Sequence, residues 1–118
     1  METKRIDNNI KESKQKINEI DNMLNIEKKK IKTLEEMKET VYELNKNLNT
    51  CISLLSKSIK GKTTDIIFND MENANRRIYM KNNNLLEEET LDTMKKINKL
   101  YIEKNNEIEK NKVQKEKE

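Results

Sequence analysis

The chain has 118 residues, of which 40% are charged and 32% hydrophobic, and it contains one glycine, one cysteine and no histidine or proline. That apolar share is too small for an ordinary globular core, and the absence of histidine excludes a histidine base or a histidine metal ligand. The net charge of +3, from 25 basic and 22 acidic residues interspersed along the chain, is unlike the clustered basic surface of a nucleic-acid-binding protein.

The near-absence of helix breakers favours long helices over disorder, and the first predicted helix runs from about residue 4 to about residue 60. Its apolar residues recur at steps of three, four and seven, the spacing of one helical face and not of a strand. Near Met37 and Val41 the stripe shifts by one seam position, which alters supercoiling locally without ending a helix. We expect Cys51 to lie on this stripe as a small core residue. The stripe comprises Ile6, Ile10, Ile17, Ile20, Leu24, Ile31, Leu34, Val41, Leu44, Leu48, Cys51, Ile52, Leu55 and Ile59.

The predicted turn lies at about residues 60–64, around the only glycine of the chain. Lys57 and Lys60 fall in the last turn of the first helix, where cations favour the negative end of the helix dipole. Gly61 then stands where a left-handed residue commonly ends a helix. Residue types that favour a helix start as N-caps follow directly, namely Thr63, Thr64 and Asp65.

The second predicted helix runs from about residue 65 to about residue 112, and a frayed, charged tail is expected over about residues 109–118. Because the connection is short, we expect the two helices to lie antiparallel, with residue i beside residue 122−i. The predicted fold is therefore all-α, a single domain of residues 1–118 that forms a long antiparallel two-helix hairpin like a coiled coil. The expected apolar neighbours are Leu55 with Ile67, Cys51 with Met71, Leu48 with Ala74, Leu44 with Ile78, and Met37 with Leu85.

Several apolar residues lie beside the predicted stripe and have no partner within such a hairpin. Leftover apolar surface on a hairpin usually marks a contact with another chain. The alternative is that these residues widen the hairpin's own contact. The set comprises Leu54, Ile66, Phe68, Leu86, Leu100 and Ile102.

Sequence features that could indicate an enzyme have structural explanations. Gly61-Lys62-Thr63-Thr64 ends as a nucleotide-binding P-loop does, but Ser56 occupies the first glycine position of that motif and a helix precedes it instead of a strand. Glu87, Glu88 and Glu89 point about 100° apart on a helix, so they do not converge on one ion. We expect no enzymatic activity, no cofactor and no metal site.

The segment from Phe68 to Leu91 reads FNDMENANRRIYMKNNNLLEEETL, and a lysine-rich helix follows it. An aromatic residue just after the turn, an Asn-Arg pair two turns later, and then Leu-Glu-Glu resemble the small accessory proteins encoded beside LXG-type toxins. Those proteins serve the type VIIb secretion system of Firmicutes and are distant relatives of WXG-type helical hairpins. An export signal of the form F-x-x-x-acidic, like that of some such accessories, is matched from Phe68 to Glu72. The predicted partner-binding residues are Phe68, Met71, Glu72, Asn75, Arg76 and Leu86.

Two departures favour an accessory protein over a secreted substrate of this system. The turn lacks the W-x-G motif, and Tyr101 is followed four residues later by Asn105 instead of an acidic residue. The resemblance thus implies a targeting chaperone that binds the helical N-terminal domain of an LXG-like toxin, alone or with a second small helical accessory protein, and assists its export.

Three other functions stay open. One is a homo-oligomeric structural coiled coil, a second is a nucleic-acid-associated protein that uses Lys28 to Lys32, and a third is an immunity protein. No apolar run approaches the length of a membrane span, and the first residues lack the apolar segment of a signal peptide. We expect no membrane insertion and a cytoplasmic location, with export only together with the partner.

Overall fold

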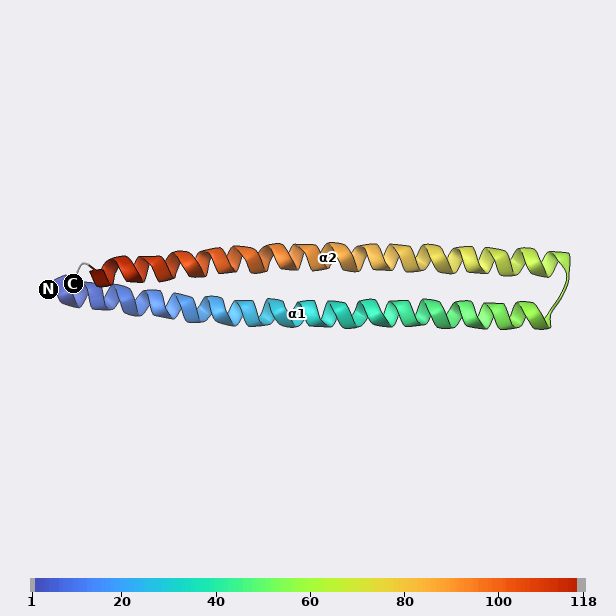
Figure 1. Ribbon diagram of the computed structural model, residues 1–118, viewed down its shortest axis with the longest axis horizontal. Coiled ribbons are helices and arrows are strands. Elements are labelled where there is room, and N and C mark those ends of the chain that lie inside the picture. Colours follow the sequence, from blue (N-terminus) through green and yellow to red (C-terminus); the bar gives the residue numbers. More distant parts are fainter. Residues whose placement is uncertain (1, 117–118) are drawn as a thin grey trace. The chain divides into compact units, whose positions relative to one another are not determined.

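A computed structural model describes the backbone of residues 2–116 and the side chains of residues 3–113. The described chain forms two α-helices and no strand, α1 spanning Glu2–Ser58 and α2 spanning Lys62–Glu116 (Figure 1). The prediction of an all-α helical hairpin is confirmed. α1 ends two residues earlier than predicted, α2 begins three residues earlier, and α2 continues past residue 112. The last two residues of the predicted tail, 117 and 118, lie outside the described residues.

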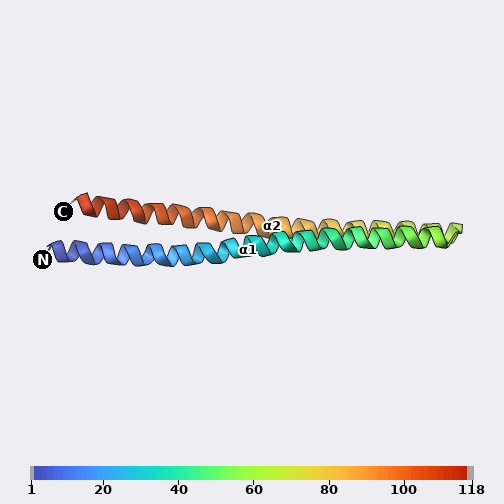
Figure 2. The same cartoon turned by 60° about the horizontal axis from the view of Figure 1, so that its bottom comes forward.

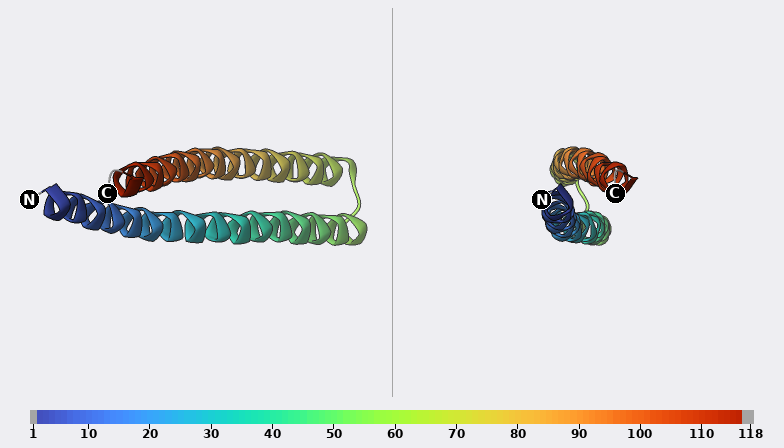
Figure 3. Two further views of the ribbon diagram at one scale, coloured as in Figure 1. Left: turned by 60° about the vertical axis from the view of Figure 1, so that its left-hand side comes forward. Right: turned by 90° about the vertical axis from the view of Figure 1, so that its left-hand side faces the viewer.

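The chain divides into two compact units. The turn unit, Lys32–Thr90, holds the end of α1, the turn and the start of α2. The terminal unit is formed by Met1–Ile31 together with Leu91–Glu118. Within each unit the segments of α1 and α2 lie side by side and antiparallel, as Figures 1 and 3 show.

Three residues, Ile59, Lys60 and Gly61, connect the two helices, and Gly61 caps the start of α2. α1 closes with a bond from the Ile59 amide to the Leu55 carbonyl at 3.0 Å, and the Gly61 carbonyl accepts the first bond of α2, from the Asp65 amide at 2.9 Å. Gly61 is therefore the N-cap residue of α2, a position that glycine tolerates well. Figure 2 shows the connection from a second direction.

The expectation of a left-handed cap at Gly61 is wrong, because α1 has already ended at Ser58. The φ angle of Gly61 is positive at 159°, far from the left-handed helical region near +57°. Thr63 and Thr64 lie inside the first turn of α2 and do not cap it. Asp65 lies in that turn too, where a carboxylate favours the positive end of the helix dipole.

The seam between α1 and α2 in the turn unit mixes apolar and polar side chains. Ile52 and Phe68 are its buried hydrophobic residues, and Asn75 is buried beside them. The Asn75 Nδ2 atom donates to the Asn49 Oδ1 atom at 2.9 Å and to the Asn45 carbonyl at 3.2 Å. The predicted register places residue 75 opposite residue 47, midway between these two acceptors, so the structure confirms the register of the hairpin around Asn75.

The terminal unit has a similar mixed seam. Ile20 and Leu24 are buried, and so are Ser13 and Thr93. The Ser13 hydroxyl donates to Glu107 Oε2 at 2.5 Å. Ion pairs flank this seam, joining Lys104 to Asp21 at 2.7 Å and Lys16 to Glu107 at 3.9 Å. The Lys28 ammonium lies 5.3 Å from the centre of the Tyr101 ring.

The structure contradicts the prediction that the apolar stripe of the turn unit is the seam. Cys51 is exposed, and Leu48 on α1 and Ile78 on α2 are 52% and 61% exposed. The seam instead contains the residues that follow the stripe residues by one position, such as Asn45 after Leu44 and Asn75 after Ala74. The expected neighbours thus share a level along the two helices but lie on an exposed side of the pair instead of in the buried seam. The stripe residues found exposed there are Met37, Leu44, Leu48, Cys51, Leu55 and Ile59 on α1, and Ile67, Met71, Ala74, Ile78 and Leu85 on α2.

Candidate partner-binding face

The exposed stripes of the two helices lie on the same side of the turn unit. Leu44 precedes Asn45 by one residue and Ala74 precedes Asn75 by one residue, so each is turned about 100° from the seam in the same rotational sense. In an antiparallel pair, equal rotations of this kind bring side chains to one common side. The two stripes therefore combine into a single surface.

We call this surface the apolar face. Its ten residues are uncharged, whereas 40% of the whole chain is charged. One charged residue, Lys81, falls between Ile78 and Leu85 at the same helical spacing. Its eight large hydrophobic side chains are each between 42% and 61% exposed. Exposed apolar surface of this kind is common at sites where proteins bind one another. The apolar face consists of Met37, Leu44, Leu48, Cys51, Leu55, Ile67, Met71, Ala74, Ile78 and Leu85.

The predicted partner-binding residues fall into three groups in the structure. Phe68 is 9% exposed and Asn75 8%, so both lie in the seam. The expectation that Phe68 faces outward is therefore wrong: Phe68 lies one heptad before Asn75 and shares its inward face. Met71 belongs to the apolar face. Glu72 and Arg76 are exposed on the opposite side of α2.

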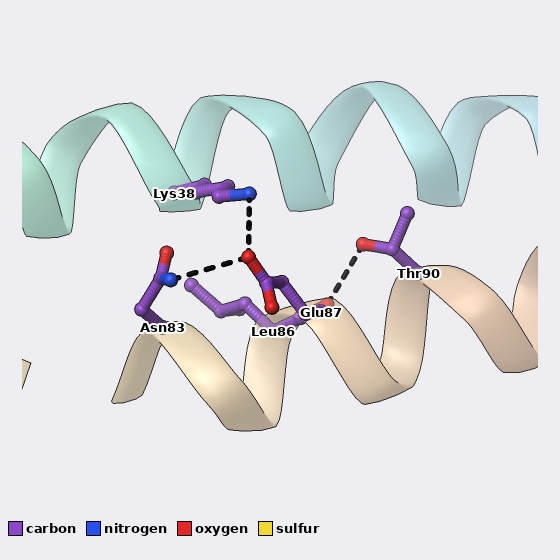
Figure 4. Close-up of polar contacts among 5 residues, drawn as sticks. All are labelled: Lys38, Asn83, Leu86, Glu87 and Thr90. Atoms are coloured by element: carbon purple, nitrogen blue, oxygen red, sulfur yellow. Dashed lines mark hydrogen bonds and ion pairs between the residues drawn. The ribbon is translucent and has the colours of Figure 1, made fainter. Parts of the chain in front are cut away.

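Leu86, the sixth predicted residue, is half-buried and lies beside a polar cluster. In Figure 4 the Lys38 ammonium reaches from α1 to the Glu87 Oε1 atom at 3.2 Å, and Asn83 Nδ2 donates to the same oxygen at 3.3 Å. The Thr90 hydroxyl donates to the Leu86 carbonyl at 2.7 Å. Leu86 thus contributes to the edge of the hairpin seam and is not on the apolar face.

The side of the turn unit opposite the apolar face is polar. Arg76 follows Asn75 by one residue, so it is turned from the seam in the other rotational sense. It donates from Nη2 to Asn73 Oδ1 at 2.5 Å, and no described carboxylate forms an ion pair with it. An open groove on this side is lined by Asn45, Asn49, Glu72, Arg76, Tyr79 and Met80.

The other predicted residues outside the stripe differ in exposure. Leu54, Ile66 and Ile102 are 59%, 64% and 62% exposed, as expected for side chains without a partner in the hairpin. Leu100 is half-buried in the terminal unit. Leu54 therefore offers an exposed leucine on α1 that lies outside the apolar face.

Neither helix, within residues 2–116, is apolar enough over a sufficient length to cross a bilayer. Over the same residues no cluster of three or more cysteine or carboxylate side chains is placed to hold a metal ion. The P-loop-like residues from Gly61 to Thr64 occupy the turn and the first residues of α2, and the element before them is the helix α1. Compared with protein-family models, with curated proteins and with solved structures, the chain matches none of them.

Proposed function

We propose that this protein is a non-enzymatic accessory protein that binds the helical N-terminal domain of an LXG-like toxin and assists its export by the type VIIb system. The apolar face carries the proposal, because it presents two exposed stripes of mostly apolar side chains side by side. An amphipathic helix of a partner fits such a surface by laying its own apolar side into it. The resemblance of residues 68–91 to LXG-associated accessory proteins suggests which partner supplies that helix.

The predicted binding residues divide into roles under this proposal. Met71 contacts the partner, since it lies on the apolar face. Phe68 and Asn75 act through the hairpin, holding the two stripes at their levels from within the seam. Glu72 and Arg76 lie on the polar side, where they are available to a second small helical accessory protein.

The test is co-expression of this chain with the helical N-terminal domain of an LXG-type toxin, followed by affinity purification of either one. We expect a stable complex that Leu48→Glu disrupts, because the substitution puts a charge in the centre of an apolar contact. Leu54→Glu is the matched control, since Leu54 is 59% exposed against 52% for Leu48 but lies off the face. Failure of the native chain to retain the toxin domain, or equal loss with both variants, contradicts the proposal.

The second candidate function is a structural homo-oligomer. The same surface favours it, because the ten residues of the apolar face are uncharged and meet their own copy without like-charge repulsion. Under this alternative the chain assembles with itself as its final state and retains no toxin domain.

A further inference from the structure

The turn unit buries little apolar surface within itself. Ile52 and Phe68 are the hydrophobic side chains that it buries, while the eight large ones of the apolar face stay about half exposed. A helix pair with an uncovered apolar side is a layer that needs a second layer against it. Covering this face with a second apolar surface therefore lowers the free energy of the chain even when no other protein is bound.

The levels of the apolar side chains indicate what covers the face. Leu55 lies level with Ile67, Leu48 with Ala74, and Leu44 with Ile78, in the register that the Asn75 contacts confirm. Within one chain both members of each pair face the same side and stay exposed. They meet when α1 of one copy is laid across α2 of another at the same level.

We propose that two copies of the free chain pair through their apolar faces into a four-helix dimer with their turns at the same end. The two-fold axis runs along the helices, so α1 of each copy packs antiparallel against α2 of the other. This operation preserves the level of every residue. Leu55 then packs on Ile67 of the second copy, and Leu44 packs on Ile78 of the second copy.

The size and charge of the face fit this occupant. Eight side chains that are 42–61% exposed offer on the order of 700 Å² per copy, near the ~800 Å² per partner of a standard stable interface. The one charged residue on the α2 stripe, Lys81, is level with Val41 of the second copy, so the symmetric contact places no like charges together. The resulting interface is isologous: the α1 stripe of each copy contacts the α2 stripe of the other copy.

The inference goes beyond the proposed function, because it concerns the state of the chain without its partner. The dimer and the toxin complex use one face, so they exclude each other. Binding of a toxin domain then requires the dimer to dissociate, and the toxin complex contains one copy of this chain at that face.

Sedimentation velocity of the purified full chain over a dilution series tests the dimer. The expected mass is twice 14.1 kDa. Leu48→Glu raises the dimer dissociation constant at least about 100-fold, because two unpaired charges enter a buried contact. Leu54→Glu leaves it unchanged. A native chain that is monomeric at every concentration, or an equal effect of both variants, overturns the proposal, and helicity measured by circular dichroism verifies that each variant is folded.

Disulfide trapping tests the arrangement. Cys51 is exposed and level with Met71, so Met71→Cys pairs with Cys51 of the second copy under mild oxidation and gives a covalent dimer. The control is Ile66→Cys, which places a thiol at an exposed site off the face. A disulfide within one chain, or equal dimer yield from both variants, overturns the arrangement. A toxin complex that forms although the free chain is monomeric sinks this inference alone and leaves the proposed function standing.

Discussion

Asn75 of α2 and Asn49 of α1 are joined by a hydrogen bond of 2.9 Å, and Asn75 is 8% exposed. The second hydrogen of the Asn75 amide goes to the Asn45 carbonyl at 3.2 Å. This side chain therefore lies where a hairpin stabilised by apolar contacts would have a leucine. A polar residue at such a position fixes the register of a helix pair at a cost in stability.

Replacing Asn75 tests its role in the register. Asn75→Ala is expected to lower the free energy of unfolding by about 1 kcal/mol, the usual loss for a hydrogen bond whose other partner can turn to water. Urea unfolding at fixed protein concentration measures it. Asn82→Ala changes an exposed asparagine of the same helix and should shift stability by less than about 0.5 kcal/mol. Equal effects of the two substitutions would contradict the role given to Asn75.

Phe68 provides the test of the hairpin seam itself. Phe68→Ala removes one of four buried hydrophobic side chains among the described residues and is expected to cost about 3 kcal/mol. Ile66→Ala, at a position that is 64% exposed, should change stability little. Thermal unfolding separates the two. If Phe68→Ala weakens toxin binding while leaving the unfolding temperature unchanged, Phe68 faces the partner and its assignment to the seam is wrong.

Gly61 is expected to tolerate side chains poorly because of its backbone and not because of space. A Cβ atom there would lie 3.5 Å from the Thr64 Oγ1 atom, an ordinary contact. The φ of 159° lies at the border of the region that residues with side chains avoid, so Gly61→Ala should cost about 1 kcal/mol, the low end for such strain. Lys60→Ala is the neighbouring control, and chemical denaturation provides the measurement. A neutral Gly61→Ala would show that the turn relaxes freely.

Two of the inter-helix ion pairs are expected to differ in strength. Lys104 and Asp21 approach to 2.7 Å with the lysine 28% exposed, whereas Lys38 and Glu87 are 3.2 Å apart and both about half exposed. Asp21→Asn should cost up to about 1 kcal/mol and Glu87→Gln a few tenths, in the range of exposed pairs. Both effects should shrink in salt. Unfolding of the two variants in low and high salt measures the difference, and a larger loss for Glu87→Gln would reverse the ranking.

The helices, their antiparallel order and their register follow from the sequence because they rest on local chemistry. Breakers are missing everywhere except near Gly61, and apolar residues recur at helical steps up to it and beyond it. The short connection then fixes which residues share a level. The inter-helix contacts of Asn75 agree with that register.

The direction in which the stripe faces could not be predicted from the same pattern. Periodicity shows which side of a helix avoids water, but it does not distinguish cover by the same chain from cover by another. The positions of Leu48 and Ile78 in the sequence are compatible both with a contact inside the hairpin and with a contact to another chain. Asn45, Asn49 and Asn75 are the residues that could have indicated the true seam, since each follows a residue of the apolar stripe by one position.

The balance of buried and exposed side chains links the amount of folded protein to its surroundings. Twenty large hydrophobic side chains are exposed among the described residues and four are buried. A molecule that covers the apolar face binds the folded chain and not the unfolded one, so it stabilises the fold with the logarithm of its concentration. The lifetime of the protein in a cell should therefore increase with the concentration of the molecule that binds the apolar face. Copies produced in excess of that molecule would be degraded first.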